Sequence, residues 1–546
     1  MKGHEMKKGQ LVTVIAEGLK FPNRAICRVV EGTEPEDYGK LIRVKNAIPG
    51  QTLLVRIAKM RHGNPEASIV EVLKQGAEEY PFTDAKNVCQ AYPACGGCMY
   101  QTLPYEKQLK LKEGMLMDLF APVLGEDRFQ KLFEGILPSP DQTEYRNKME
   151  FSFGDSVKDG PLELGMHKRG SFYDIVDASD CRIVDSDFRQ ALQLTRDYFR
   201  KTGLPFFHRN SHEGYLRHLL VRKAAKTGQI LIDLVTTSQI TEGEEALLTG
   251  WKDLLLEASW AGSLTGILHT KNDRISDVVI DEGTDILYGQ GYFEEELLGL
   301  HFKITPFSFF QTNSRGAEEL YRLARTYILH GGVAGKGEAG QDDTLEKQVT
   351  AGADVPGPMD RADALEKQVT AGADVSGAID RADALTASAK NADQADALTN
   401  KTVYDLYSGT GTIAQILSPS AGKVVGVEIV PEAVEAAKAN ARENGIENCR
   451  FLCGDVLKVL DTIEEKPDMI VLDPPRDGVH PKALTKILDY GVEEILYISC
   501  KPTSLVRDLP VMEEAGYHPV RMAAVDLFPS TPNVETVVLL SKGEGE

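Results

Sequence analysis

From about residue 401 onward the chain alternates short apolar strands with helices, and this alternation constrains its fold most. The first strand, 403–406, leads directly into a glycine-rich turn at 407–412. Alternating strands and helices are typical of a doubly wound α/β sheet, in which helices cover both faces of mostly parallel strands. Ligands bind such sheets at the edge where the strands end. We therefore predict a C-terminal α/β domain of the Rossmann-like class with a ligand crevice at that edge.

Four strands of this region end in carboxylates that the sheet would bring to one crevice, namely Asp405, Glu428, Asp455 and Asp473. Glu428 lies about twenty residues past the glycine-rich turn, where a carboxylate can accept hydrogen bonds from both ribose hydroxyls of an adenosine. Asp455 is expected to meet the adenine edge. The alternative is that these carboxylates only cap the helices that follow them.

The glycine-rich turn itself narrows the choice of cofactor. Its glycines, Gly409 among them, let the backbone approach a ligand closely. The turn lacks the Gly-x-Gly-x-x-Gly pattern, which makes NAD a less favoured ligand. The order of the strands and carboxylates resembles the S-adenosylmethionine methyltransferase fold, so S-adenosylmethionine is the expected cofactor.

The chemistry is indicated by two motifs at the same edge. Asp473-Pro474-Pro475 resembles the substrate-side motif of methyltransferases that act on planar nucleobases. The next strand, 495–499, delivers Cys500 to this edge, followed by the cation Lys501. A thiol beside a cationic residue is well placed to ionise and attack. The alternative interpretation is a small apolar core residue, the usual role of a lone cysteine.

A thiolate is what methylation of uracil at C5 requires. Addition of sulfur to C6 generates an enolate and makes C5 nucleophilic. After methyl transfer, a general base must remove the hydrogen from C5. Glu535 opens the apolar strand 536–540 and is the candidate base, with a solvated surface carboxylate as its alternative role.

Together these motifs resemble a known family, the bacterial RNA (uracil-5-)-methyltransferases, and most closely their 23S rRNA branch. The resemblance rests on Ser-Cys-Lys-Pro at 499–502, Pro-Asn-Val-Glu at 532–535, the turn 405–411 and Phe-Phe-Gln-Thr-Asn at 309–313. It implies Cys500 as nucleophile and Glu535 as base. The implied contacts are Gln311, Tyr407, Glu428 and Asp473 with the cofactor, Phe309 with a flipped uracil, and Arg146 and Lys148 with RNA.

The resemblance also implies a metal centre. Cys89, Cys95 and Cys98 with the remote Cys181 resemble the ligand set of a 4Fe–4S cluster. Their spacing alone equally permits a zinc site with four thiolates. Cys27, Cys449 and Cys453 show no such pattern, and we expect them to be buried.

The N-terminal part differs from the rest of the chain. Residues 7–75 contain short β-rich segments separated by turn signals, which predicts a small barrel of the OB type. It resembles the RNA-binding TRAM module, with a purely structural β-domain as the alternative. A central α+β domain at 76–305 and the methyltransferase domain at 306–546 follow. Within the latter, 331–400 is a low-complexity insertion, expected to be disordered, that repeats one eleven-residue motif at 345 and 365.

The net charge of −21 argues at first against a nucleic-acid partner. The repeat insertion alone carries thirteen Asp or Glu against six Lys or Arg, whereas residues 1–80 carry thirteen Lys or Arg against ten acidic residues. RNA needs only a local basic face. We therefore expect an RNA partner, and the family resemblance implies 23S rRNA. We also expect a monomer. No apolar run has membrane-spanning length, so a cytoplasmic location without a membrane partner is expected.

Three other functions compete with this prediction. An RNA cytosine-C5 methyltransferase also uses a thiolate, but such enzymes usually carry a cysteine beside Asp-Pro-Pro, where this chain has Arg476. A non-catalytic rRNA-binding assembly factor would keep the fold without needing both Cys500 and Glu535. A radical enzyme would carry Cys-x3-Cys-x2-Cys, which the cysteines at 89–98 do not match.

Overall fold

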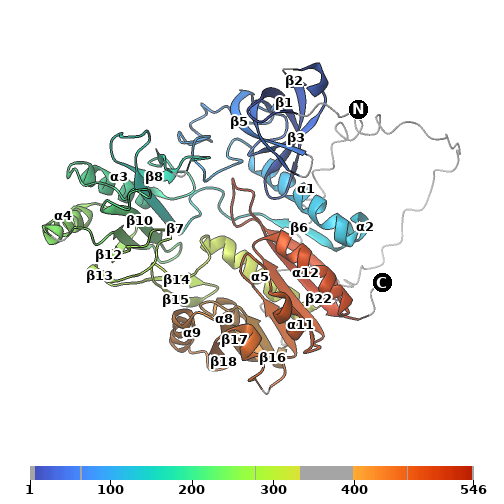
Figure 1. The fold of residues 1–546 in the computed structure, drawn as a ribbon. Helices are drawn as coiled ribbons and strands as arrows, with labels where there is room; N and C mark the ends of the chain where they lie inside the picture. Colours follow the sequence, from blue (N-terminus) through green and yellow to red (C-terminus); the bar gives the residue numbers. More distant parts are fainter. Residues whose placement is uncertain are drawn as a thin grey trace, which may run out of the picture.

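The computed structural model describes residues 6–331 and 398–543, apart from 33, 62–63, 172, 241, 277 and 464. Most of the predicted insertion therefore lies outside the described residues. Figure 1 shows three parts: a small barrel, a sheet domain beside it, and a larger sheet domain built mainly from the C-terminal residues. Among the helices of the described ranges, none combines the length and the apolar character needed to cross a membrane.

The N-terminal part is a closed barrel in the order β1-β2-β3-β5-β4. Its strands are β1 (Leu11–Lys20), β2 (Arg24–Glu31), β3 (Leu41–Lys45), β4 (Thr52–Arg61) and β5 (Asn64–Lys74), with the short 3-10 helix η1 (Pro35–Asp37). Side chains alternate along β1, so that Val12, Val14 and Ala16 fill the interior. The barrel core extends to Tyr100 and to Met115 of helix α1 (Tyr105–Leu124), which docks the barrel onto the rest of the molecule.

The central domain is a seven-stranded sheet in the order β13-β12-β11-β10-β7-β8-β9. Its strands are β7 (Lys148–Gly154), β8 (Glu163–His167), β9 (Ile175–Asp177), β10 (Leu216–Lys223), β11 (Gln229–Thr236), β12 (Ser263–Lys271) and β13 (Thr284–Gly289). Helices α3 (Ser186–Arg200) and α4 (Glu244–Glu257) cover one face, where Phe199 and Trp251 belong to the same core as Phe151 and Phe153 of β7.

The C-terminal domain is an eight-stranded sheet in the order β18-β17-β16-β19-β20-β22-β21-β6. Its strands are β16 (Leu398–Leu406), β17 (Ala421–Glu428), β18 (Cys449–Cys453), β19 (Met469–Leu472), β20 (Glu494–Ser499), β21 (Tyr517–Val525), β22 (Glu535–Lys542) and β6 (Phe133–Leu137). β16 pairs in parallel with both β17 and β19, so the strand order reverses between these two neighbours. This reversal is the point at which open α/β sheets bind ligands.

Helices cover both faces of this sheet. One face packs against α5 (Ser314–His330), α8 (Thr412–Leu417) and α9 (Pro431–Glu443), together with the hairpin β14 (Phe293–Leu297) and β15 (Leu300–Ile304). The other face packs against α1, α2 (Glu126–Leu132), α10 (Val456–Val459), α11 (Pro481–Leu488) and α12 (Pro502–Glu514). A 3-10 turn, η3 (Ser418–Ser420), follows α8.

The fold class predicted from the sequence is confirmed: a barrel, a central α+β domain and a C-terminal α/β sheet. One feature is additional. β6 lies in the range predicted for the central domain, yet it pairs in parallel with β21 as the edge strand of the C-terminal sheet. The segment that contains β6, although it precedes the central sheet in sequence, therefore belongs to the C-terminal α/β domain.

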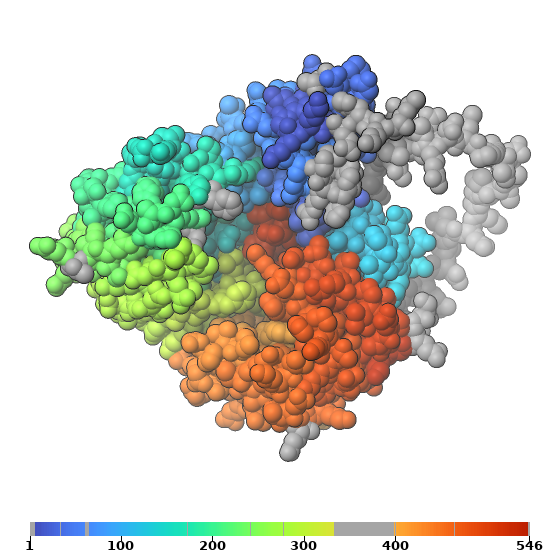
Figure 2. All heavy atoms as spheres, viewed as in Figure 1, coloured from blue at the N-terminus to red at the C-terminus, as the bar shows by residue number. Residues whose placement is uncertain are grey.

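The three parts meet around the loop that joins β21 to β22. This loop rises from the C-terminal sheet toward the segment before α1 (Figure 1), where Ser530 accepts hydrogen bonds from the backbone of Met99 and Tyr100. Figure 2 shows residues near the C-terminus, coloured red, in the hollow between the barrel, the central domain and the α/β domain.

Candidate active site

Cys500 and Glu535 lie at the same edge of the sheet because of the register between β20 and β22. Ser499, the last residue of β20, pairs with Thr536 on the antiparallel strand β22. The next residue on each strand past this pair is Cys500 on one and Glu535 on the other. Asp473 follows the neighbouring strand β19 at the same end. The structure thus brings the predicted nucleophile, the predicted base and the Asp-Pro-Pro motif together.

Glu535 is a buried carboxyl with an altered ionisation. Its side chain is 2% exposed. Burial raises the pKa of Glu535 to about 8, Asp473 contributes in the same direction, and the guanidinium of Arg476 opposes both. Burial also raises the pKa of Asp473 to about 7, although its side chain is still reachable from solvent at the crevice mouth. A base with a pKa near the working pH is suited to removing a proton from carbon.

Cys500 is half-buried and its thiol is not set to ionise in the free protein. Burial raises the pKa of Cys500 to about 11, and Glu535 and Asp473 raise it in addition. The cation that lowers it is Arg476, from the Asp-Pro-Pro turn, and not Lys501. The prediction that an adjacent cation promotes ionisation of the thiol is therefore wrong for this state, because two carboxyls and burial outweigh the guanidinium.

A tyrosine that the sequence did not single out lies beside these carboxyls. Tyr321 of α5 is buried, and Asp473, Glu535 and Asp405 all contribute to raising its pKa above the usual range. Tyr321 lies on the apolar face of the amphipathic helix α5, so the sequence pattern is that of an ordinary core residue. Only the packing of α5 against β20 to β22 turns it toward the crevice.

The glycine-rich turn has the backbone geometry that a close ligand requires. Tyr407, Gly409 and Gly411 all have positive φ, at 68°, 54° and 73°. A Cβ on Gly411 would lie 2.6 Å from the ring of Phe451, so only glycine fits there. A Cβ on Gly409 would meet nothing closer than the ring of Phe309, at 3.9 Å. The turn is therefore open on the side of Phe309.

Asp455 shows the capping role that was the alternative in the sequence, whereas Glu428 does not cap the helix that follows it. Glu428 accepts hydrogen bonds from the backbone amides of Gly409, Ile429 and Val430, at 2.9, 2.9 and 3.0 Å. Asp455 caps α10 by accepting from Leu457 at 2.9 Å. Contact with a ribose or an adenine remains a prediction for both. The hydrogen bond from Gly409 holds Glu428 against the glycine-rich turn, so both are already in place before a ligand binds.

Two polar atoms in this crevice lack a protein partner among the described residues. Asp405 is fully buried and accepts a hydrogen bond from Ala414, but its Oδ1 has no partner. Burial, Asp473 and Glu428 raise the pKa of Asp405 to about 8. The hydroxyl of Ser408 likewise has no partner. Buried polar groups in this condition are costly, and a bound ligand or water would satisfy them.

Gln311 and Phe309 lie on the loop between β15 and α5. Asn147 of the central domain holds this loop by donating to the backbone oxygen of Gln311 and to the hydroxyl of Ser314, both at 2.8 Å. Phe309 is 69% exposed. An exposed aromatic ring beside the glycine-rich turn is available to a planar ligand.

Comparison with known proteins identifies the family of this chain. The family model described as tRNA (Uracil-5-)-methyltransferase matches residues 389–543. A Clostridium tetani protein named an uncharacterized RNA methyltransferase is 41% identical over 538 residues, which cover 98% of this chain and 99% of the relative. Another, from Caldanaerobacter subterraneus, is 40% identical over 539 residues, covering 98% of this chain and all of the relative. The chain belongs to the RNA (uracil-5-)-methyltransferase family.

A solved structure shares the whole fold of this methyltransferase. The tRNA (uracil-54, C5)-methyltransferase of Pyrococcus abyssi, in complex with S-adenosyl-L-homocysteine, superimposes with a TM-score of 0.63. The match covers 96% of this chain and 100% of that one, at 21% identity.

The two basic residues predicted to face RNA lie on either side of Asn147. Arg146 donates to the backbone oxygen of Lys148 at 3.3 Å. Burial and the nearby Arg222 lower the pKa of Lys148 to about 8. Arg222, which the sequence did not single out, pairs across the sheet with Lys148 and donates to the backbone oxygens of Pro306 and Ser308. Arg222 thus holds the loop that carries Phe309, and Lys148 is its neighbour on the adjacent strand.

The four predicted metal-ligating cysteines converge. Cys89, Cys95, Cys98 and Cys181 line one small apolar cavity beside the central sheet. Within the described ranges, however, no group of three or more His, Cys, Asp or Glu side chains is placed to hold a metal ion. The structure therefore gathers the four thiols around one cavity. Of the other cysteines, Cys27 is buried as expected, whereas Cys453 is exposed, contrary to expectation.

A buried lysine fixes the loop that ends at Glu535. Lys112 of α1 donates to Asp526 at 2.7 Å and to the backbone oxygens of Phe528 and Asn533 at 3.2 and 3.1 Å. Both charged side chains are fully buried. Four hundred residues separate the partners in sequence, so no local pattern could have indicated this contact.

Proposed function

We propose that this methyltransferase transfers a methyl group from S-adenosylmethionine to C5 of a uridine in RNA. The observation that carries the proposal is the convergence of Cys500, Glu535 and the Asp473-Pro474-Pro475 turn at one edge of the sheet, next to its switch point. The open glycine-rich turn and the unpaired Oδ1 of Asp405 support a cofactor beside them. We assign the cofactor contacts to Gln311, Tyr407, Gly409, Glu428, Asp455 and Asp473.

The residues divide the chemistry between them. Cys500 loses its proton to solvent, and its sulfur bonds to C6 of the uracil, which moves the electron pair of the C5–C6 double bond onto C5 and the carbonyl. When bound, the cofactor supplies an electrophilic methyl group on a sulfonium, whose positive charge favours the thiolate. Ionised Glu535 then takes the proton from C5. The electron pair left behind re-forms the double bond and expels the sulfur of Cys500.

We assign the target base to the space beside Phe309. Its exposed ring can stack on a uracil that has left its helix, which an enzyme acting on a base edge requires. Arg146 and Lys148 are only partly buried beside this loop and can hold flanking phosphates. Arg222 is buried and holds the loop itself through the backbone oxygens of Pro306 and Ser308. The barrel supplies further RNA contacts in the manner of a TRAM module.

The preferred substrate is 23S rRNA, and the enzyme acts as a cytoplasmic monomer. The test is incubation with tritiated S-adenosylmethionine and RNA from cells that lack this protein, followed by nucleoside analysis. The proposal expects 5-methyluridine in the 23S fraction. 5-Methylcytidine would favour the cytosine alternative, and label confined to tRNA would contradict the choice of rRNA. No label with intact RNA binding would favour an assembly factor.

We further propose that the four cysteines hold a 4Fe–4S cluster. Their convergence on one cavity supports this, and Met99 joins the last of the three clustered cysteines to the Ser530 loop. Four thiolates permit either a cluster, whose four irons each take one cysteine sulfur, or a zinc ion, and the resemblance to the family's ligand set favours the cluster. Absorption and iron content of anaerobically purified protein are the readout. Stoichiometric zinc without iron, or neither, would contradict the cluster.

A further inference from the structure

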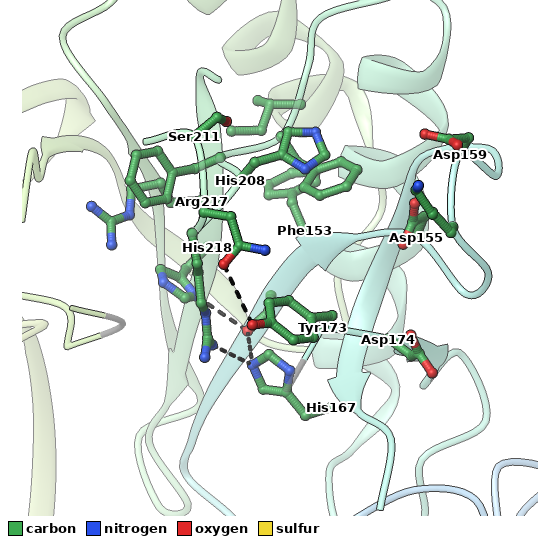
Figure 3. A pocket seen from close by; sticks show the side chains of 17 residues that line it. Phe153, Asp155, Asp159, His167, Tyr173, Asp174, His208, Ser211, Arg217 and His218 are labelled. Carbon is green, nitrogen blue, oxygen red and sulfur yellow. Dashed lines mark hydrogen bonds between the residues drawn. The ribbon is translucent and has the colours of Figure 1, made fainter. Parts of the chain in front are cut away.

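The central domain contains a second cavity, of about 510 Å³, that the reaction at the α/β sheet does not use. Strands β7 and β10 form its floor, and its walls are formed by the loop at 155–159, by Tyr173 and Asp174, and by the loop at 206–211. Figure 3 shows His208 and Ser211 on one side of it, Tyr173 and His167 on another, and three aspartates along its margin. Cavities that bind small ligands or single nucleotides have this size.

The walls are aromatic. The rings of Phe206 and His208 lie 4.2 Å apart between centroids, and the guanidinium of Arg217 lies 4.4 Å above the ring of Phe207. Tyr173 is 58% exposed, and its hydroxyl donates to the amide oxygen of Asn210 at 3.5 Å. Exposed aromatic faces in a recess are the usual means of stacking an unpaired base.

The floor is polar. The hydroxyl of Ser152 lies 3.3 Å from both Nε2 of His167 and Nδ1 of His218. Arg209 lies 3.4 Å from the same Nε2 of His167, and because a guanidinium can only donate, that nitrogen accepts. A network of hydroxyl, imidazole and guanidinium groups can present both donors and acceptors to a base edge.

The charges of the lining select the class of ligand. The lining contains three cations, Arg209, Arg217 and Lys158, and three carboxylates, Asp155, Asp159 and Asp174. The guanidinium of Arg217 is bonded to backbone oxygens of residues 272–276, and Asp174 also lies 3.6 Å from Lys168, so the carboxylates are not outnumbered by cations facing the cavity. Because the carboxylates repel negative charge, such a lining does not favour a polyphosphate ligand. Carboxylates accept hydrogen bonds from the exocyclic amino groups of cytosine, adenine and guanine, and uracil has no such group. A single cation at the mouth can still meet one phosphate.

The cavity is joined to the target loop by the two strands of its floor. Lys148 and Arg222 pair at one end of β7 and β10, and Ser152 and His218 pair at the other. Four residues of strand separate the two ends, roughly 13 Å at about 3.3 Å per residue. Because Arg222 also binds Ser308, a single RNA strand would need only a few nucleotides to reach from the Phe309 loop to this cavity.

We propose that this cavity binds one unstacked nucleotide of the RNA substrate, with a base that carries an exocyclic amino group, a few positions from the target uridine. This inference rests on the proposed function, because it assumes that the substrate is RNA. It adds a second nucleotide site, which fixes the register of the strand while the target base lies at Cys500.

The test measures binding of two fluorescent single-stranded oligonucleotides, rC12 and rU12, to the full-length protein without S-adenosylmethionine. Both are pyrimidine strands of equal charge, and only cytosine has the amino group. The wild type is expected to bind rC12 several-fold more tightly than rU12. Tyr173→Ala should weaken rC12 binding roughly tenfold, the cost of one lost base stack. Arg209→Ala should reduce the preference for rC12.

Matched variants separate the pocket from general effects. Tyr173→Phe keeps the ring and should bind within twofold of the wild type. Arg450→Ala removes an exposed cation on β18, in the other sheet, and should change nothing. Equal affinities of the wild type, Tyr173→Ala and Arg209→Ala for rC12 would overturn the proposal, as would equal affinity of the wild type for the two strands.

A kinetic measurement distinguishes failure of this site from failure of the proposed function. In methyl transfer to total RNA, Tyr173→Ala should raise KM for RNA about tenfold and leave kcat unchanged. Uridine methylation with unchanged KM in this variant would overturn the pocket alone. Absence of methyl transfer by the wild type, with the oligonucleotide pattern intact, would overturn the proposed function alone.

Discussion

Glu535 is protonated at neutral pH in the free protein because it is buried beside another carboxyl, and a general base must first lose that proton. If Glu535 removes the proton from C5, Glu535→Gln should block only the last step. The variant should accumulate a covalent complex between protein and methylated RNA, while turnover falls by about two to four orders of magnitude. Denaturing gel electrophoresis with labelled RNA measures the complex. Loss of turnover without a complex would show that Glu535 acts before or during attack.

The pKa of Glu535, about 8, also predicts a pH dependence. The ionised fraction of a group with this pKa rises through the range from pH 7 to 9, and the rate of methyl transfer should rise with it. Arg476 lowers this pKa, so Arg476→Ala should move the profile to higher pH. Single-turnover rates across this range provide the measurement. A profile already flat above pH 6 would contradict a raised pKa.

At the residue scale, the sequence predicted the catalytic and cofactor-binding candidates that lie at the ends of strands. The strand pattern and the motifs were enough to predict Cys500, Glu535 and Asp473. The register of the strands then brings them to the same edge of the sheet. Tyr321 and Lys112 were missed because their roles arise from packing between distant segments. The state of the Cys500 thiol was misjudged because its environment is set by Glu535 and Asp473, which are neighbours only in space.

At the scale of elements, the loop from β21 to β22 depends on helix α1. The ion pair between Lys112 and Asp526 is fully buried. Lys112→Met leaves the carboxylate without its partner, and breaking such a pair costs about 3–5 kcal/mol of unfolding free energy. We expect a lower Tm and a fall in kcat that exceeds any change in KM for RNA, because Glu535 ends the same loop.

Two comparisons test that expectation. Lys438→Met breaks an exposed pair with Glu435 and should leave the Tm nearly unchanged. The double variant Lys112→Met with Asp526→Asn removes the unpaired charge and should recover part of the stability, but not the kcat. Equal Tm for Lys112→Met and Lys438→Met would show that the buried pair is not what holds the loop.

Element types were easier to predict than element partners. Strands of the α/β sheet were evident because buried parallel strands are short apolar runs bounded by turns. The pairing of β6 with β21 could not be predicted, since nothing in five residues specifies an edge position in a sheet formed almost four hundred residues later. For Glu428 and Asp455, the sequence offered both capping and ligand contact. The structure shows capping for Asp455, whereas Glu428 accepts a hydrogen bond from Gly409 of the glycine-rich turn.

At the scale of the whole molecule, an acidic protein must bind a polyanion through a local cluster of cations. The net charge is −21, yet the partly buried cations Arg146 and Lys148 lie close together beside the Phe309 loop. If Lys148 contacts a phosphate, Lys148→Ala should weaken RNA binding at low salt and reduce the slope of log affinity against log salt by about 0.7–0.9. Lys438→Ala, on the exposed surface of α9, serves as the control. An unchanged slope for Lys148→Ala would place the phosphates elsewhere.

The central claim is that Cys500 attacks C6 of a uracil in RNA. The most direct measurement uses RNA in which uridine is replaced by 5-fluorouridine, because fluorine at C5 cannot leave as a proton and the adduct persists. After digestion, mass spectrometry should find the modified nucleotide, methylated, on the peptide that contains Cys500. Cys500→Ala should form no adduct, while Cys453→Ala, which removes an exposed thiol, should form it normally. An adduct of equal yield in Cys500→Ala, or one attached to another residue, would contradict the account.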